Sequence, residues 1–411
     1  MKNNRTFLEK LLDGAEVEWK TLDEISSIYG GLTGKSKADF ENGNAFYVPY
    51  KNIFNNIEVD FNNLETVNVS DDEKQYTIKY GDVLFTGSSE TAEEAGMSSA
   101  VTTKTEQKIY LNSFSFGLRF NDDVELLPEF SKFLFRTLSI RKEIVKSASG
   151  VTRFNISKAR FKKIKIPIPP LSVQTEIVKI LDALTALTSE LTSELTLRRK
   201  QYEYYREKLL SEEELGKVGF EWRSLGEICK KVSSGGTPLS TKDEYYNGNI
   251  PWLRTQEVQF NEIWDTEVKI TQDGLNNSSA KWIPENCVIV AISGATAGRS
   301  AINKIALTTN QHCCNLQIAH EYANYRYVFH WVCKEYEKLK SLGQGARADL
   351  NSGIIKNYPI ALPTLREQHR IVSILDKFET LTNSITEGLP LAIEQSQKRY
   401  EYYRELLLNF S

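Results

Sequence analysis

One phrase occurs twice in this chain, as KQYEYYREKLL at residues 200–210 and as KRYEYYRELLL at residues 398–408. The segments before it repeat in the same order, residues 171–182 as residues 365–376 and residues 17–26 as residues 220–229. The chain has 411 residues, so the period is near half its length, which is too long for a solenoid repeat. The repeat therefore predicts two tandem units, each large enough to bury a core of its own.

Each unit is expected to be a globular α+β body followed by a long helix. Short β-rich runs separated by turn residues fill residues 45–120, among them AFYVPY, YTIKY, DVLFTG and SFSFGLRF. Apolar residues at helical spacing predict that helix is concentrated near residues 128–145. The second body follows the same order, with IPWL at residues 250–253 and CVIVAI at residues 287–292 in the corresponding places.

The long helices are expected to begin after Pro170 and Pro363, because proline cannot lie inside a helix. Apolar residues then recur at three- and four-residue steps, which is typical of an amphipathic helix. An arm of about 40 residues would be roughly 60 Å long, so we expect the two helices to pair as an antiparallel coiled coil. Gly388 followed by Pro390 predicts a break in the second helix near residues 388–390.

The start of the chain, FLEKLL at residues 7–12, resembles the end of the repeated phrase, as if the C-terminal helix completed a junction there. We therefore expect a pseudo-two-fold arrangement with the termini close together. The predicted boundaries are a first body at residues 1–170, a central spacer helix at 171–214, a second body at 215–364 and a C-terminal spacer helix at 365–411.

Charge and cysteine content limit the kinds of partner and compartment. The formal net charge is -3, but residues 146–165 hold seven basic residues and no acidic one, which predicts a basic working face; a solvated loop is the alternative. All five cysteines lie in the second unit without CxxC spacing, which favours reduced packing cysteines over zinc bound with His312, and we expect no metal site. No run approaches the roughly 18 apolar residues that span a membrane, and no signal peptide is seen, so a cytoplasmic protein is expected.

No motif in the chain predicts catalysis. YGGLTGKS at residues 29–36 lacks the first glycine of a phosphate-binding loop, because Tyr29 occupies its place. There is no glycine-rich cofactor loop and no Asn/Asp-Pro-Pro-aromatic tetrapeptide of the amino-methyltransferases, since Pro169 and Pro170 lie between Ile168 and Leu171. A complete methyltransferase is therefore disfavoured.

Two variable bodies alternating with two similar helices, the TSELTSEL repeat at residues 188–195, the TLTNSITEGLP segment at residues 380–390 and the paired YEYYRE endings resemble the specificity subunit of type I restriction-modification enzymes. The resemblance implies a non-catalytic subunit that recognises double-stranded DNA. Each body would be a target-recognition domain for one half of a bipartite site, and the helices would set the gap. Two methylation subunits would bring S-adenosylmethionine and methylate adenine, and restriction subunits would bring ATP and Mg²⁺. The alternative is a coiled-coil scaffold without base-specific reading.

Base recognition needs side chains with paired donors and acceptors, and phosphate contacts fix the register. Polar and basic loop residues are the candidates for DNA binding: Lys35, Lys37, Lys51, Asn52, Ser88, Arg153, Asn155, Lys158, Thr237, Arg254, Gln256, Ser293, Arg299, Gln311, Arg347 and Asn351. The repeated phrase, which is nearly identical in both copies, is assigned to partner binding or to the junction between helix and body through Tyr202, Tyr205, Arg206, Tyr400, Tyr403 and Arg404.

Overall fold

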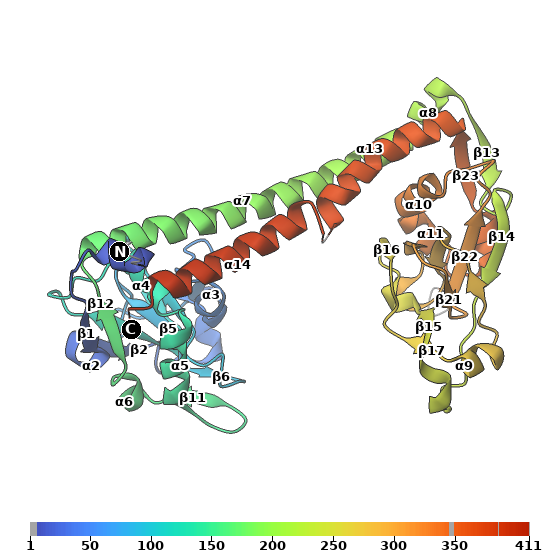
Figure 1. Cartoon of the computed structure of the whole chain (residues 1–411). Helices are drawn as coiled ribbons and strands as arrows, with labels where there is room; N and C mark the ends of the chain where they lie inside the picture. The colour runs from blue at the N-terminus through green and yellow to red at the C-terminus, as the bar shows by residue number, and fades with distance from the viewer. Residues whose placement is uncertain (1–5, 345–348, 385, 411) are drawn as a thin grey trace, which may run out of the picture. The chain divides into compact units, whose positions relative to one another are not determined.

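The computed structural model describes residues 6–344, 349–384 and 386–410. The chain divides into two compact units, the first formed by residues 1–190 and 393–411 and the second by residues 191–392 (Figure 1). Each unit combines one body of mixed helices and strands with parts of the long helices, which confirms the predicted α+β class. Among the described helices, none is both long and apolar enough to cross a bilayer.

Within its described residues, the first body contains twelve strands and six short helices with one 3₁₀ turn. The strands are β1 (Glu18–Thr21), β2 (Ser26–Gly30), β3 (Ala45–Val48), β4 (Glu65–Val67), β5 (Val83–Thr86), β6 (Ser88–Ser89), β7 (Ser98–Ala100), β8 (Ile109–Leu111), β9 (Ser115–Phe120), β10 (Ala148–Ser149), β11 (Phe154–Ile156) and β12 (Lys165–Ile168). The helices are α1 (Phe7–Leu12), α2 (Leu22–Ile25), η1 (Lys37–Phe40), α3 (Tyr50–Asn55), α4 (Pro128–Leu134), α5 (Leu138–Ser147) and α6 (Lys158–Phe161).

The second body, within the described residues, has strands β13 (Phe220–Ser224), β14 (Cys229–Ser234), β15 (Tyr246–Leu253), β16 (Asn261–Ile263), β17 (Lys269–Ile270), β18 (Trp282–Ile283), β19 (Val288–Ala291), β20 (Ser300–Asn303), β21 (Leu307–Thr309), β22 (Cys313–Ile318) and β23 (Pro359–Pro363). Its helices are α8 (Glu212–Val218), η2 (Asp243–Tyr245), η3 (Thr255–Glu257), α9 (Gln272–Asn276), η4 (Gly294–Thr296), α10 (Tyr325–Lys334), α11 (Tyr336–Ser341) and α12 (Ser352–Asn357).

Most of the strand pairings are shared by the two bodies, whereas the small sheet β10-β11-β6 is described in the first body only. The sheet β2-β9-β5-β7 of the first corresponds to β14-β22-β19-β20 of the second, which β16 extends. The strand before each body pairs antiparallel with the strand that leaves it, β1 with β12 and β13 with β23. The parallel pair β3 and β8 corresponds to β15 and β21. The sequence repeat is therefore a repeat of fold.

The long helices follow the bodies as predicted. Helix α7 (Leu171–Leu209) is continuous over 39 residues and begins directly after Pro170. The second segment is interrupted between α13 (Leu365–Asn383) and α14 (Leu389–Leu407), and α14 begins directly after Gly388, with Pro390 in its first turn. In the first unit α14 lies beside α7, with Thr188 Oγ1 2.8 Å from Ser396 Oγ (Figure 1). In the second unit Tyr205 of α7 stacks on Phe378 of α13, with 5.4 Å between ring centroids.

A buried glutamine joins helix to body in each unit. The Gln174 side chain, which is fully buried, accepts a hydrogen bond from the Leu127 amide at 2.9 Å and donates to the carbonyls of Glu125 at 2.8 Å and Pro169 at 2.7 Å. Gln368 repeats this pattern, accepting from the Asn324 amide at 2.9 Å and donating to the carbonyls of Tyr322 and Pro363. Since buried backbone groups need partners, these amides fix the first turn of each helix against its body.

A second repeated contact lies two turns further along each helix. Asp182 of α7 binds the buried ammonium of Lys132 from α4 at 2.9 Å. At the corresponding position of α13, Asp376 binds the Arg326 guanidinium of α10 at 2.7 Å. The same carboxylate therefore takes a cation from the body in both units, although the cation differs.

The described ends of the chain meet in the first unit. Leu8 of α1 belongs to the same buried cluster as Leu407 and Leu408, at and just beyond the end of α14. In the second unit Leu210, just after α7, and Leu215 of α8 lie in the corresponding core. The predicted proximity of the termini is confirmed for residues 7–408.

The predicted concentration of helix near residues 128–145 is confirmed by α4 and α5, and between them the buried hydroxyl of Thr137 donates to the Leu134 carbonyl at 2.8 Å. One local prediction was wrong. The YTIKY run forms no strand; within it Thr77 makes only an isolated bridge to Tyr110 and Ile78 is buried in a core cluster. The YTIKY run is therefore held by contacts that are distant in sequence and not by a strand ladder.

Replacing Gln174 with methionine should loosen the start of α7 in the first unit alone. The Leu127 amide and two carbonyls would lose buried partners, which should lower the free energy of local opening by about 3 kcal/mol. Amide hydrogen exchange of the full chain would show faster exchange around residues 125–130. Gln368→Met is the matched variant, with its effect around residues 322–328. Unchanged exchange at Leu127 in Gln174→Met would contradict the role of this contact.

Candidate nucleic-acid interface

A pocket of about 320 Å³ opens where four segments of the first body meet. The segments are α3, the chain after β5, the loop between β8 and β9, and the hairpin of β10 and β11. The residues lining the pocket are Tyr50, Lys51, Phe54, Ser88, Ser89, Glu90, Glu94, Phe114 and Arg153. Three predicted DNA-binding residues, Lys51, Ser88 and Arg153, are therefore brought together from distant parts of the sequence.

A small sheet holds Arg153 at the tip of its hairpin. Strand β11 pairs with β10 on one side and with β6 on the other, with Phe154 opposite Ser89. The turn between β10 and β11 requires glycine, because Gly150 has φ +153° and a Cβ there would lie 1.8 Å from the Arg153 carbonyl oxygen. Val151 beside it is 91% exposed. The tip thus presents its side chains to solvent on a short, tightly defined turn.

The loop between β8 and β9 presents Phe114 in the same way. The buried Asn112 side chain accepts a hydrogen bond from the Phe114 amide at 3.0 Å and donates to the Val48 carbonyl at 3.0 Å. A Cβ on Gly87 would come within 2.7 Å of the Phe114 carbonyl oxygen, so only glycine at position 87 allows the two backbones to lie this close. The backbone is fixed, while the Phe114 ring is 62% exposed.

Helix α3 provides the aromatic wall of the pocket. The Tyr50 ring stacks on Phe54 with centroids 5.9 Å apart, and its hydroxyl donates to the Ser88 carbonyl at 2.8 Å. Burial raises the pKa of Tyr50, so the hydroxyl remains a hydrogen-bond donor at neutral pH. This contact links α3 directly to the strand that pairs with the hairpin.

Two largely buried arginines hold the backbone of segments that line the pocket. The Arg136 guanidinium donates to the carbonyls of Ile53, Phe54 and Asn56, at the end of α3, and to that of Ser98. Arg141 donates to the carbonyls of Glu93, Ala95 and Gly96, next to Glu94. Burial lowers the pKa of each arginine to about 10, so both remain charged at neutral pH. Their hydrogen bonds replace the partners that a helix end and an irregular loop lack.

The other predicted residues of the first unit fall into two groups. Lys37, Asn155 and Lys158 are exposed near the body surface. Lys35 and Asn52 are engaged within the fold: the Lys35 side chain is only 6% exposed and its ammonium lies 2.5 Å from Glu73. Asn52 is buried and its amide donates to the Asp60 and Asn63 carbonyls.

In the second unit several predicted residues also bond to protein groups. Thr237 donates to Gln311, Arg254 binds Glu267 at 2.8 Å, and the Asn351 side chain caps α12 by accepting from the Ile354 amide at 2.9 Å. Gln256 is exposed, whereas Ser293 and Arg299 are half-buried on the two sides of η4. Arg347 lies outside the described residues.

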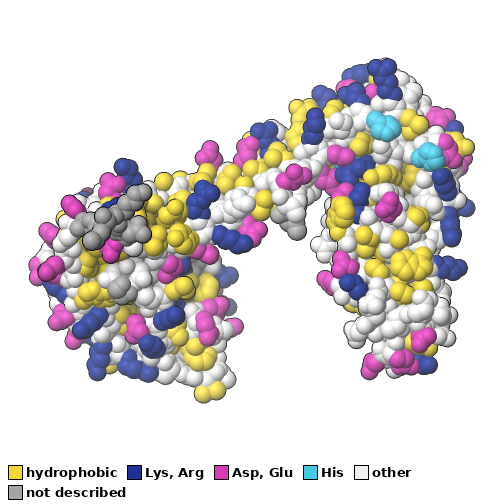
Figure 2. All heavy atoms as spheres, viewed as in Figure 1, with side chains coloured by type: hydrophobic (Ala, Val, Ile, Leu, Met, Phe, Trp, Pro, Cys, Tyr) yellow, Lys and Arg dark blue, Asp and Glu magenta, His cyan; other side chains and the backbone are white. Residues whose placement is uncertain are grey.

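The basic segment at residues 146–165, which includes the hairpin of β10 and β11, lies on the surface of the first unit. Figure 2 shows Lys and Arg side chains gathered at the end of this unit where Figure 1 places α6. Within it Lys146 pairs with Glu143 at 2.6 Å and Lys162 with Asp23 at 2.9 Å. The exposed basic residues of the segment are Arg153, Lys158, Arg160, Lys163 and Lys165. Arg153 therefore belongs both to this basic segment and to the pocket lining.

The repeated phrase divides between inward and outward residues in the same way in both units. Both inward tyrosines contact their bodies. The Tyr202 hydroxyl lies 3.1 Å from His330 Nδ1, and the Tyr400 ring lies beside the Phe133 ring, with 6.3 Å between centroids. The guanidinium groups of Arg206 and Arg404 lie over these two tyrosine rings.

The other tyrosines form paired exposed rings, Tyr204 with Tyr205 and Tyr402 with Tyr403, each pair with centroids 5.3 Å apart. Tyr204 and Tyr402, which were not among the predicted partner residues, are the more exposed members, at 58% and 63%.

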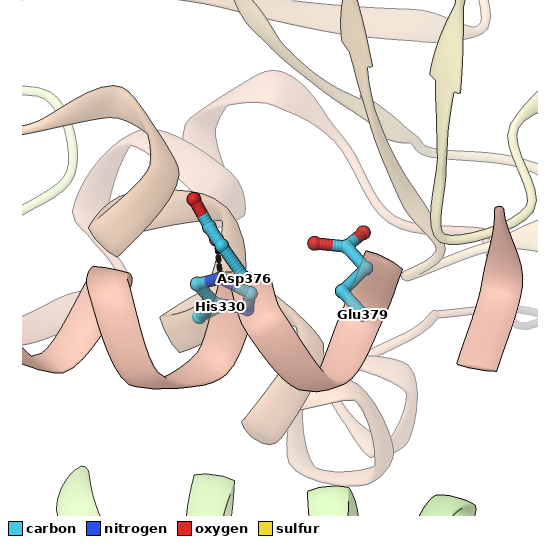
Figure 3. Close-up of side chains that lie close together, drawn as sticks. All are labelled: His330, Asp376 and Glu379. Carbon is cyan, nitrogen blue, oxygen red and sulfur yellow. Dashed lines mark hydrogen bonds and ion pairs between the residues drawn. The ribbon is translucent and has the colours of Figure 1, made fainter. Parts of the chain in front are cut away.

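A cluster of potential metal ligands lies at the helix-to-body junction of the second unit. The ligand atoms of His330, Asp376 and Glu379 all lie within 4.8 Å of one another (Figure 3). The Arg326 guanidinium already binds these carboxylates, Asp376 at 2.7 Å and Glu379 at 2.5 Å.

Burial lowers the pKa of His330, so its ring is neutral; Nε2 then donates to Asp376 at 2.7 Å and Nδ1 accepts from Tyr202. The cluster is a structural ion-pair network between α10 and α13.

Sequence reasoning missed the acidic and aromatic members of the pocket. Glu90, Glu94, Phe114 and Tyr50 were not among the predicted site residues. Arg136 and Arg141 carried no sequence signal, because their carbonyl partners lie 38 to 83 positions away.

Comparison with known proteins gives one consistent result. The family model for the type I restriction modification DNA specificity domain matches residues 15–197 and again residues 217–395. A Haemophilus influenzae relative assigned as a type I restriction enzyme specificity subunit is 39% identical over 100% of both chains. The EcoR124I/EcoR124II specificity subunit of Escherichia coli is 36% identical over 98% of this chain and 97% of its own. The crystal structure of the S subunit from M. genitalium has the same fold, with a TM-score of 0.53 at 15% identity over 97% and 98% of the two chains.

Replacing Arg136 with methionine should loosen α3 and with it the aromatic wall of the pocket. The carbonyls at the end of α3 would lose their donor, which should lower the local stability of residues 50–56 by about 3 kcal/mol. Hydrogen exchange of the full chain measures this directly. Arg160→Met is the control, because Arg160 is exposed and should change stability by no more than about 0.5 kcal/mol. Equal effects of the two substitutions would contradict the supporting role of Arg136.

Proposed function

The chain belongs to the type I restriction modification DNA specificity domain family, and we propose that it is the non-catalytic DNA-recognition subunit of a type I restriction-modification complex. The observation that carries this proposal is the double match of the family model, once to each unit of the repeat. Relatives that match over nearly their whole length support the same role for the whole chain. The scaffold alternative has no comparable support.

Each body reads one half of a bipartite double-stranded DNA site in this proposal. The loop backbones correspond: Asn310 accepts from the His312 amide at 3.1 Å, as Asn112 does from Phe114. The backbone N–H of Asn112 donates to the Val48 carbonyl, and that of Asn310 donates to the Leu253 carbonyl. In this correspondence Phe114 is equivalent to His312. Lys51 and Gln256 are also equivalent, because they lie three residues after Val48 and Leu253. Equivalent positions thus carry different donors, acceptors and apolar groups, which is what reading two different half-sites requires.

The exposed basic segment of the first body would contact phosphates rather than bases. Lys158, Arg160, Lys163 and Lys165 present cations on one surface without acidic neighbours in sequence. Phosphate contacts of this kind fix the register of a protein on DNA and make its binding salt-dependent. The exposed members of the predicted set, Lys37, Asn155, Thr237, Gln256 and Gln311, remain candidates for contacts to the grooves.

Two methylation subunits would dock on the repeated helix ends, because the tyrosine pairs are the same in both units. A partner that binds Tyr204 and Tyr205 finds the same exposed pair at Tyr402 and Tyr403. Those subunits would hold S-adenosylmethionine and methylate adenine on each side of the site. Restriction subunits, with ATP and Mg²⁺, would join the same complex.

Exchanging residues 15–165 for the corresponding body of another family member should change one half-site and leave the other intact. Mapping of methylated adenines in cells that produce the chain with its partner subunits gives both half-sites. The matched variant, in which the second body is exchanged instead, should alter only the other half-site. Changes in both half-sites after a single exchange would contradict separate reading.

Deleting Ser189 to Thr192 should shorten the gap between the half-sites and leave their sequences unchanged. The deletion removes about 6 Å of rise from the continuous helix α7, between one and two base-pair steps of about 3.4 Å. The same methylation mapping measures the gap. Substituting the four residues by alanine keeps the length and serves as control, with no change expected. Altered half-sites with an unchanged gap would defeat the spacer role.

A further inference from the structure

The pocket of the first body contains carboxylates as well as cations. Glu90 and Arg153 each lie one residue beyond the last paired position of their strands, since Ser89 pairs with Phe154. Both line the pocket together with Lys51 and Glu94. Within the described part of the chain, no hydrogen bond or ion pair occupies these four side chains. Charged groups of both signs are therefore held next to each other with their bonding capacity unused.

A carboxylate on a DNA-reading surface needs a specific partner. Close to phosphates a glutamate is repelled, so it contributes nothing to general DNA affinity. A carboxylate can only accept hydrogen bonds, and in the major groove the donors are the amino groups of cytosine and adenine. Glutamate paired with the cytosine amino group is an established form of direct readout. The acidic residue therefore indicates base recognition and not phosphate binding.

Arg153 supplies the complementary chemistry. Its guanidinium is a rigid fork of donors, which fits the O6 and N7 acceptors of guanine better than any other base edge. A G·C pair presents these acceptors and the cytosine amino donor side by side in the major groove. Glu90 and Arg153, on adjacent strand ends, offer one acceptor and one donor fork at neighbouring positions.

We propose that this pocket reads a G·C base pair in the half-site of the first body, with the Glu90 carboxylate accepting from cytosine N4 and the Arg153 guanidinium donating to guanine O6 and N7. The inference rests on the proposed function and specifies its chemistry. The supports are already in place: the paired strands hold Arg153, the Tyr50 hydroxyl ties α3 to Ser88, and Arg141 holds the loop beside Glu94. Phe114, which is 62% exposed at the pocket edge, is suited to apolar contact with a neighbouring thymine methyl.

The test uses the full chain assembled with its methylation subunits and duplexes that carry the mapped site. For wild type, replacing the G·C pair by A·T should weaken binding by about 5- to 150-fold. In Glu90→Gln and Arg153→Lys this ratio should fall toward one, because glutamine loses the charge and lysine keeps the charge but loses the fork. Glu106→Gln, an exposed carboxylate outside the pocket, should leave the ratio unchanged.

Base analogues separate groove contacts from general effects. Replacing guanine with 7-deazaguanine removes the N7 acceptor and should weaken wild-type binding much more than it weakens binding of Arg153→Lys. Inosine in place of guanine removes only a minor-groove amino group and should have little effect. Two controls test whether each variant is folded: it should assemble with its partner subunits, and its hydrogen exchange outside the pocket should match that of the wild type.

Three outcomes would overturn the inference: a first half-site without any G·C pair, equal weakening of all duplexes by Glu90→Gln and Arg153→Lys, or an inosine effect as large as that of 7-deazaguanine. In each of these the wild-type complex still discriminates its site from unrelated DNA, so the proposed function would stand. Loss of that discrimination in the wild-type complex would instead remove the proposed function itself.

Discussion

The arrangement of each unit depends on one buried amide side chain. Gln174 and Gln368 each bond to a backbone amide of the body, to a carbonyl near it and to the carbonyl of the proline residue where the last strand leads into the helix. A single side chain thus connects the last strand of the body, the turn before α4 or α10 and the first turn of the helix. Any loop carried by the body is thereby held in a defined orientation to the start of that helix, because removing the amide would leave three buried polar groups without partners.

At the junction of helix and body, equivalent contacts in the two units are made by different types of residue. Asp182 takes a lysine and Asp376 an arginine, while the tyrosine of the repeated phrase meets Phe133 in the first unit and His330 in the second. The geometry of the junction is kept, although the paired residues have changed together. This pattern is expected where packing and pairing, and not the identity of a side chain, are what the junction requires. The loops far from the junction show the opposite behaviour, with similar backbones and unrelated side chains.

The repeated segments allowed the helices, the junctions and the tandem organisation to be predicted, because both copies report local helix signals and apolar spacing. Prediction failed where a partner distant in the sequence decides the outcome. The YTIKY run forms no strand, and Thr77 within it makes only an isolated bridge to Tyr110. The pairing of Lys35 with Glu73, 38 positions away, likewise has no local signal. At the candidate site the sequence identified Lys51, Ser88 and Arg153 as separate loop residues. It could not show that they share a pocket, nor that acidic and aromatic residues complete it, since only the fold brings β6, α3 and the hairpin together.

The asparagine turn that carries Phe114 in one body and His312 in the other has a consequence for how such a protein changes over generations. In both turns the buried Asn112 or Asn310 side chain holds the backbone by accepting from the amide at the tip. The residue at the tip contributes only a backbone N–H to this bond, and every residue except proline has one. A single codon change at such a position can therefore replace the group presented to a ligand while the path of the loop persists. New binding preferences become accessible in one step, without an unstable intermediate that selection would remove.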